Sequence, residues 1–269
     1  MKDLRIALAV TVSPVGKTGD NLDQMDRWIA LAVKEGATII CFPEMNMTGY
    51  SSRSEIQNVA QPIPGDVSRR VSAMAARAGI TILSGMAEKD PGGHFFASHL
   101  VATPDGVVQV YRKTHIAPPE KQIFSSGQTV PLFDINGLRF GVLLCYDAHF
   151  PELSTLMALN GADIIFFPHA SPRGTSEEKF QSWMRHLSAR AFDNGLFVAA
   201  VNQTGDNGLG LSFPGTAVVI GPDGEVLSRD VSGQEGLLVA ELKSETLAHV
   251  RHHPMRYFLP NRRPEIYAG

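Results

Sequence analysis

The sequence predicts an α/β protein with four layers, an αββα sandwich in which two mixed β-sheets stack face to face under outer helices. Short apolar runs alternate with helical patterns along the chain, which is typical of βα crossovers. This order is interrupted twice by a Pro-Asp-Gly turn between apolar runs, at residues 104–106 and 222–224. Such turns predict hairpins. The chain therefore consists of two related halves that we expect to close on each other.

The first half contains most of the predicted crossovers. We expect strands at residues 6–12, 37–42 and 81–85, helices at 22–35 and 67–78, and hairpin strands at 95–103 and 107–111. The helix at 22–35 follows from the spacing of its apolar residues, which places them on one face. The second half repeats this plan. We expect strands at 139–144 and 163–167, helices starting at Pro151 and covering 180–194, and hairpin strands at 216–220 and 226–229.

Length and composition set the broad class of the protein. No linker rich in Gly, Ser or Pro divides the 269 residues, so we expect one domain over 1–269. The net charge of −3 gives no reason to expect a nucleic acid or an anionic membrane as partner. No apolar run approaches the roughly 18 residues of a membrane span. The apolar N-terminus favours a buried strand over a signal peptide, and two cysteines favour a cytoplasmic protein without disulfides.

Cys145 occupies the most informative position in the chain. It follows the predicted strand 139–144 and precedes the helix that starts at Pro151. A cysteine at such a turn lies at the carboxyl edge of the sheet, where free backbone N–H groups can stabilise a thiolate or an oxyanion. The alternative is a small buried thiol, which is the interpretation we give to Cys41.

Glu44 and Lys113 follow two other strands directly. Taken singly, Glu44 is equally consistent with a solvated loop and Lys113 with a solvated strand end. Together with Cys145 they make a working acyl-transfer site. Cys145 is the nucleophile, Glu44 exchanges protons with the thiol and the leaving amine, and Lys113 neutralises the developing oxyanion.

These residues stand in sequence motifs that resemble those of the nitrilase superfamily of carbon–nitrogen hydrolases. The motifs are Phe-Pro-Glu44, Tyr-Arg-Lys113-Thr-His and Cys145-Tyr-Asp-Ala-His-Phe-Pro-Glu152. Further similar segments are Phe124–Gly127, Ser188–Asn194, Phe213–Gly224 and Arg263–Tyr267, so the resemblance covers nearly the whole chain. It implies the αββα fold and a catalytic triad of Glu44, Lys113 and Cys145.

The same resemblance implies further roles. Glu120 would help to place the substrate and the catalytic groups, and the backbone N–H of Tyr146 would bind the oxyanion. The family also implies at least a homodimer. The apolar face of the helix at 180–194 and a C-terminal tail, residues 250–269, would lie at the subunit interface. We expect no metal or organic cofactor, because the His252-His253 pair has no Cys, Asp or Glu at ligand spacing.

The expected substrate is a small molecule with an amide or carbamoyl group. Family members that act on ω-amides often carry Arg where this chain has His149, so an anionic substrate tail becomes less certain. Other candidate substrate contacts are Tyr50, and His169 and Arg173 in the segment after the strand 163–167. The alternative for that segment is an ordinary solvated loop.

Two further functions remain open from the sequence. Nitrile hydrolases of the family usually carry Trp-Glu after the nucleophile, where this chain has Tyr146-Asp147. This difference favours an amide over a nitrile. A binding protein of the same fold without catalysis is the other alternative, and the intact set of Glu44, Lys113 and Cys145 argues against it.

Overall fold

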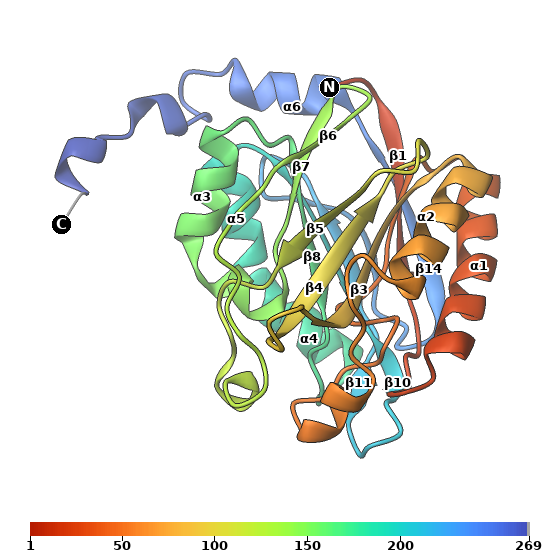
Figure 1. The fold of residues 1–269 in the computed structure, drawn as a ribbon. Helices are drawn as coiled ribbons and strands as arrows, with labels where there is room; N and C mark the ends of the chain where they lie inside the picture. Colours follow the sequence, from red (N-terminus) through yellow and green to blue (C-terminus); the bar gives the residue numbers. More distant parts are fainter. Residues whose placement is uncertain (268–269) are drawn as a thin grey trace.

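Two six-stranded mixed sheets form the centre of the computed structural model, which describes residues 1–267 (Figure 1). The first sheet has the order β14-β1-β2-β3-β4-β5 and the second β13-β12-β9-β8-β7-β6. In each sheet three neighbouring strands are parallel, β1–β2–β3 and β7–β8–β9, and the flanking strands are antiparallel. The two halves of the chain thus have the matching layouts that the repeated pattern predicted.

The strands of the first sheet are β1 (Leu4–Val10), β2 (Ile39–Cys41), β3 (Thr81–Lys89), β4 (Phe95–Ala102), β5 (Val108–Arg112) and β14 (Gly236–Leu242). Those of the second sheet are β6 (Phe133–Ile135), β7 (Leu138–Val142), β8 (Ile164–His169), β9 (Phe197–Asn202), β12 (Ala217–Ile220) and β13 (Val226–Asp230). A separate ribbon pairs β10 (Thr204–Asp206) with β11 (Ser212–Pro214).

Helices cover the outer face of each sheet. The helices α1 (Thr18–Lys34) and α2 (Asp66–Ala78) lie on the first sheet, and α3 (Pro151–Leu159), α4 (Ser176–Met184) and α5 (Leu187–Asn194) lie on the second (Figure 1). The alternation of side chains along β1 explains this layering. Ile6, Leu8 and Val10 belong to the core shared by the two sheets, whereas Ala7 and Ala9 pack with α1 and α2. The predicted four-layer sandwich is therefore confirmed.

The prediction of one helix over residues 180–194 is wrong in one respect. The segment forms two helices, α4 and α5, which are separated at Arg185 and His186. Trp183 and Leu187, on either side of this break, are both buried. Because the apolar spacing continues across the break, the pattern gives no sign of it.

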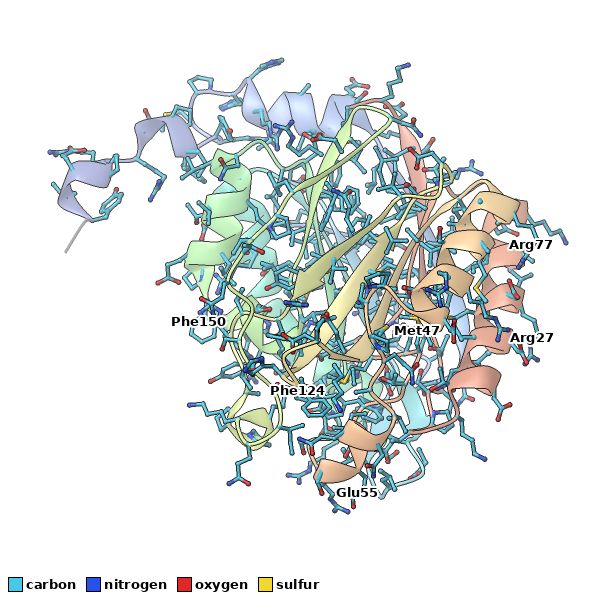
Figure 2. All side chains as sticks on the ribbon, in the orientation of Figure 1. Arg27, Met47, Glu55, Arg77, Phe124 and Phe150 are labelled. Atoms are coloured by element: carbon cyan, nitrogen blue, oxygen red, sulfur yellow. The ribbon has the colours of Figure 1, made fainter. Side chains whose placement is uncertain are left out.

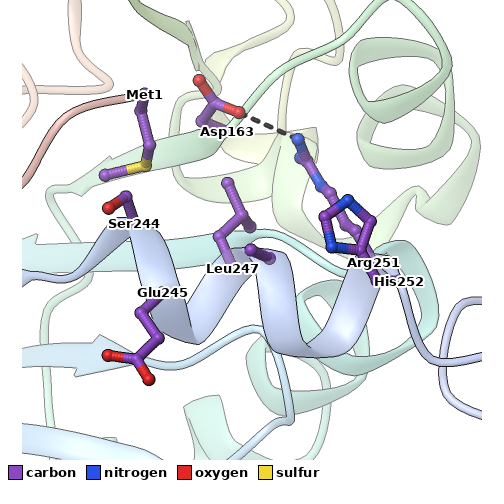
Figure 3. Close-up of a pocket in the computed structure, with 8 residues that line it drawn as sticks. Met1, Asp163, Ser244, Glu245, Leu247, Arg251 and His252 are labelled. Atoms are coloured by element: carbon purple, nitrogen blue, oxygen red, sulfur yellow. Dashed lines mark hydrogen bonds and ion pairs between the residues drawn. The ribbon is translucent and has the colours of Figure 1, made fainter.

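The C-terminal part of the chain leaves the sandwich after β14. Helix α6 (Ser244–Arg251) packs at one end of the sheets, and the following tail extends away from the body (Figure 1). An ion pair of 2.9 Å between Arg251 and Asp163, which precedes β8, holds α6 in place (Figure 3). Residues 268–269 of the predicted 250–269 tail lie outside the described residues. No helix within 1–267 is both long and apolar enough to cross a bilayer.

Candidate active site

Three strand ends bring the predicted catalytic side chains to one edge of the sandwich. Glu44 follows β2 and Lys113 follows β5, both in the first sheet, while Cys145 follows β7 in the second. Side chains just beyond the carboxyl ends of strands commonly form the active sites of α/β proteins. The two stacked sheets therefore contribute different members of one site.

Lys113 lies at the centre of a fully buried cluster of charges. Its Nζ donates hydrogen bonds to Glu44 Oε1 at 2.9 Å and to Glu120 Oε2 at 2.9 Å. The Tyr50 hydroxyl donates to Glu120 Oε1 at 2.8 Å. Lys113 and Glu44 have no exposed surface, and Glu120 is 2% exposed. Buried charges of this kind persist only when they are paired and hydrogen-bonded, as they are here.

Burial and pairing set the charge states of this cluster. Burial raises the pKa of Glu44 to about 7, an effect that the Lys113 charge opposes and the Glu120 charge reinforces. Burial lowers the pKa of Lys113, but the two carboxylates outweigh it, so the pKa lies above its ordinary value. The Glu44 carboxyl group thus has a pKa near neutrality and lies next to an ammonium group that stays charged.

Cys145 has a backbone conformation that few residues other than glycine adopt. Its φ of 41° lies in the left-handed region, at the start of the 3₁₀ helix η3 (Cys145–His149). Burial and the charge of Glu44 raise the pKa of its thiol to about 12, against the opposing effect of Lys113. The thiol is therefore protonated at neutral pH and needs a base to become a nucleophile.

The turn after β2 is held close to β3 and to the second sheet. Met45 has a φ of 53°, and a Cβ on Gly85 would lie 2.4 Å from the Met45 nitrogen, so only glycine fits there. The Ala170 N–H donates to Glu44 Oε2 at 3.1 Å, and the Gln203 side chain donates to the Glu44 carbonyl oxygen at 2.7 Å. The residue that follows β8 thus holds the Glu44 carboxylate, and the residue that follows β9 holds the Glu44 backbone.

The remaining predicted residues lie at different distances from the charge cluster. The Tyr146 ring packs edge-on against the His149 and Phe150 rings. His149 is exposed and lies against His186, with 4.7 Å between the ring centroids. The hydrogen bonds and ion pairs that join Glu44, Lys113 and Glu120 do not include the His149 side chain.

His169 and Arg173 follow β8 but differ in burial. His169 is 3% exposed, and its ring lies tilted against the Trp183 ring with 4.3 Å between the centroids. Within residues 1–267 neither of its ring nitrogens has a hydrogen-bond partner. Burial holds its pKa well below the ordinary value, so the imidazole is neutral. Arg173 is exposed, with a φ of 71°, and its backbone N–H donates to the Ser212 carbonyl.

A cavity of about 490 Å³ adjoins the site. We call it the side cavity, and its lining residues are Thr114, His115, Ile116, Lys121, Phe124, Ser126, Tyr146 and Phe150. Two of these residues, Phe124 and Phe150, are labelled in Figure 2. Thr114, Lys121 and Tyr146 directly follow Lys113, Glu120 and Cys145 in the chain. The cavity is therefore bordered by the neighbours of three candidate catalytic residues.

Two polar residues at the site were not predicted. Asp147 is completely buried and binds the segments around Lys113 and Cys145, and Gln203 holds the turn of Glu44. Asp147 comes shortly after the predicted strand 139–144, which is the signal that could have found it, whereas no strand was predicted before Gln203. Among the described residues, no group of three or more His, Cys, Asp or Glu side chains is arranged to hold a metal ion.

Comparison with known proteins gives a consistent result. The sequence model of the carbon–nitrogen hydrolase family matches residues 6–252. A nitrilase of Pyrococcus abyssi is 31% identical over 251 residues, which cover 92% of both chains. An (R)-stereoselective amidase of a Pseudomonas species is also 31% identical, over 80% of this chain and 78% of its own.

Solved structures show the same fold. The structure of a variant of the amidase from Nesterenkonia sp. AN1 superimposes with a TM-score of 0.85 and 28% identity, over 98% of both chains. That structure shows the result of Michael addition of acrylamide at the active-site cysteine of the amidase.

Proposed function

Since this chain belongs to the carbon–nitrogen hydrolase family, we propose that it cleaves a linear amide or an N-carbamoyl group through a covalent intermediate on Cys145. The observation that carries this proposal is the buried Glu44–Lys113–Glu120 cluster, whose charges act on the thiol of Cys145. The thiol needs a base, and the pKa of Glu44 suits that task at neutral pH.

In the first step, Glu44 accepts the thiol proton while the sulfur of Cys145 attacks the carbonyl carbon. The oxygen takes up the negative charge, which the Lys113 ammonium and the backbone N–H of Tyr146 stabilise. The C–N bond then breaks as Glu44 returns the proton to the leaving nitrogen. Ammonia or an amine departs, and the acyl or carbamoyl group stays on the sulfur.

In the second step, water attacks this intermediate and gives one proton to Glu44. The same oxyanion forms again and is stabilised by the same groups. The C–S bond breaks, and the sulfur recovers the proton from Glu44. The acid product is released and the free thiol is restored. Protein side chains and one water molecule carry every proton in this scheme.

The side cavity is the place that we assign to the part of the substrate beyond the reacting group. Its walls combine apolar side chains, among them Ile116, Phe124 and Phe150, with polar ones, and the exposed Lys121 adds a positive charge. Such a lining fits a small group that has both an apolar part and a hydrogen-bond acceptor. Tyr50, His149, His169 and Arg173 do not line it and remain candidate contacts for the opposite end of the substrate.

A panel of compounds tests the reaction. The protein and its Cys145→Ala variant are incubated with ω-amides, N-carbamoyl amines, N-carbamoyl amino acids and short nitriles, and ammonia release is measured. We expect release from one amide or carbamoyl class with the wild type only. Activity retained in Cys145→Ala would rule out the proposed nucleophile. A wild type that binds members of the panel but releases ammonia from none of them would instead support the non-catalytic binding function.

Nitrile hydrolysis is the second candidate, because the Pyrococcus abyssi protein at 31% identity is described as a nitrilase. The same nucleophile would attack the nitrile carbon. Acid and ammonia formed from a short nitrile, faster than from the matching amide, would favour this reaction over the first.

We also propose that the protein acts as a homodimer or a larger homo-oligomer. Phe192 on α5 and Met255, Phe258, Ile266 and Tyr267 in the tail are exposed although they are large and apolar. A second copy of the chain would cover them. Light scattering at micromolar concentration is expected to give at least twice the monomer mass of 29.2 kDa, and a monomer would contradict the proposal.

A further inference from the structure

The Asp147 carboxylate is the acceptor for an unusually large set of hydrogen bonds. Its Oδ1 accepts from the Thr114 hydroxyl at 2.9 Å and from the His115 backbone N–H at 2.8 Å. Its Oδ2 accepts from the Tyr111 hydroxyl at 2.7 Å and from the Leu144 backbone N–H at 3.0 Å. The carboxylate is completely buried, so these protein groups replace its hydration.

The partners of Asp147 belong to two segments from different sheets. Tyr111, Thr114 and His115 surround Lys113, at the end of β5 in the first sheet. Leu144 immediately precedes Cys145, at the turn after β7 in the second sheet. One side chain therefore fastens the segment that carries Lys113 to the turn that carries Cys145.

A carboxylate is the side chain that this arrangement requires. The His115 N–H donates to Oδ1 and the Leu144 N–H donates to Oδ2, and a backbone N–H cannot act as an acceptor. The other two donors are hydroxyl groups, which can rotate. An amide has one acceptor oxygen, so an asparagine would place its NH₂ group against one of these two N–H groups. The His115 ring Nδ1 also lies 3.1 Å from Asp147 Oδ1.

We propose that Asp147 is a positioning residue that fixes the thiol of Cys145 relative to the ammonium of Lys113. This inference rests on the proposed function, in which the sulfur and the Lys113 Nζ act on the same carbonyl group. Asp147 does not touch the substrate in this scheme. It acts through the backbone of the two segments that it joins, and its loss displaces reacting groups without removing one.

The Asp147→Asn variant tests this role through the split between kcat and KM. Misplacement of reacting groups by about 1 Å can cost on the order of 100-fold in rate. We expect kcat to fall by about that factor while KM changes by less than about threefold, because the cavity walls formed by Lys121, Phe124, Ser126 and Phe150 lie outside the two joined segments. A purely structural role would lower the melting temperature and leave kcat of the folded protein unchanged.

Thr114→Val provides a milder variant in case Asp147→Asn does not fold. It removes one of the donors to Oδ1 and keeps the charge and the other partners. Losing one such hydrogen bond corresponds to a fall in kcat of about fivefold. If both variants act through the same contact, their effects on kcat in the double variant are not additive.

Asp163→Asn is the matched control. Asp163 is also a buried carboxylate, and it binds Arg251 at 2.9 Å and the Arg139 backbone N–H at 3.2 Å (Figure 3). It precedes β8, whereas the candidate active site follows the carboxyl end of that strand. We expect Asp163→Asn to destabilise the protein without changing kcat.

Hydrogen exchange measured by mass spectrometry separates this inference from the proposed function. In Asp147→Asn we expect faster exchange in both segments, around residues 113–116 and 143–147, and no change around Arg139 and Arg251. In Asp163→Asn we expect faster exchange around Arg139 and Arg251 and no change in the two segments that Asp147 joins. Unchanged exchange at Asp147→Asn, or faster exchange with an unchanged kcat, would overturn the positioning role. A wild type inactive on the whole panel would refute the proposed function, while the exchange result would still decide whether Asp147 joins the segments.

Discussion

Lys113 Nζ lies 2.9 Å from Glu44 Oε1, and neither side chain has any exposed surface. The two residues are 69 positions apart in the chain and follow different strands of the same sheet. Glu120 Oε2 lies 2.9 Å from the same ammonium. Two carboxylates thus share one cation, and this sharing determines how each responds to substitution and to pH.

Replacing Lys113 by alanine is expected to affect both stability and chemistry. Two buried carboxylates would lose their common cation, and breaking a buried pair in this way costs about 3–5 kcal/mol. Turnover would also cease, because the oxyanion loses its charged partner. Urea unfolding measures the first effect and ammonia release the second. The exposed Lys121 provides the control: Lys121→Ala should change stability by no more than about 0.5 kcal/mol.

Glu44→Gln is expected to stop turnover while leaving substrate binding intact. The amide keeps the shape of the side chain but cannot take the thiol proton, so we expect kcat to fall by about 10²–10⁴-fold. Isothermal titration with the substrate should still detect binding. Glu120→Gln removes the same charge from beside Lys113 without removing the base. A loss of kcat in Glu120→Gln as large as that in Glu44→Gln would contradict the assignment of Glu44 as the base.

The pH dependence of kcat/KM reports the pKa of Glu44 in the free enzyme. Burial raises the pKa of Glu44 to about 7, and only the deprotonated form can accept the thiol proton. We therefore expect kcat/KM to rise with pH through about 7. Because the charge of Glu120 contributes to the raised pKa, the midpoint should move to lower pH in Glu120→Gln. A midpoint that stays in place, or moves upward, would show that another group controls the profile.

The pattern of strand ends explains why the sequence could predict the main residues of the site. Side chains that follow parallel strands meet at one edge of a sheet, so Glu44 and Cys145 could be placed from the order of elements alone. The left-handed backbone of Cys145 could not be, since non-glycine residues seldom adopt it. The hydrogen bond between Tyr50 and Glu120 joins segments 70 residues apart and has no local signature.

The helical segment after β8 shows the limit of periodicity. Trp183 and Leu187 have the spacing of one continuous helix, and both are buried. The helix is nevertheless interrupted between them, at Arg185 and His186. The contact between the tilted rings of Trp183 and His169 joins α4 to the end of β8. This contact belongs to the tertiary structure, which overrides the local preference for a single helix.

Stability is expected to fall in mild acid because of His99, on β4. His99 has no exposed surface, and burial lowers its pKa to about 3. In the unfolded chain its pKa would be about 6.5, so below that pH the unfolded state binds a proton that the folded state excludes. Stability is therefore highest above about pH 6.5 and is lost as the pH falls toward 3. For one such histidine, the loss between pH 7 and pH 5 amounts to about 2 kcal/mol.

Urea unfolding at pH 7 and at pH 5 measures this loss, and His99→Asn tests its source. The variant is expected to be less stable than the wild type at pH 7, because a smaller side chain leaves a cavity. However, the loss of stability between pH 7 and pH 5 should be about 2 kcal/mol smaller in the variant than in the wild type. His252→Asn, at an exposed position, should leave that difference unchanged. An equal difference in the wild type and in His99→Asn would assign the acid sensitivity to other buried groups, of which His169 and His186 also have lowered pKa values.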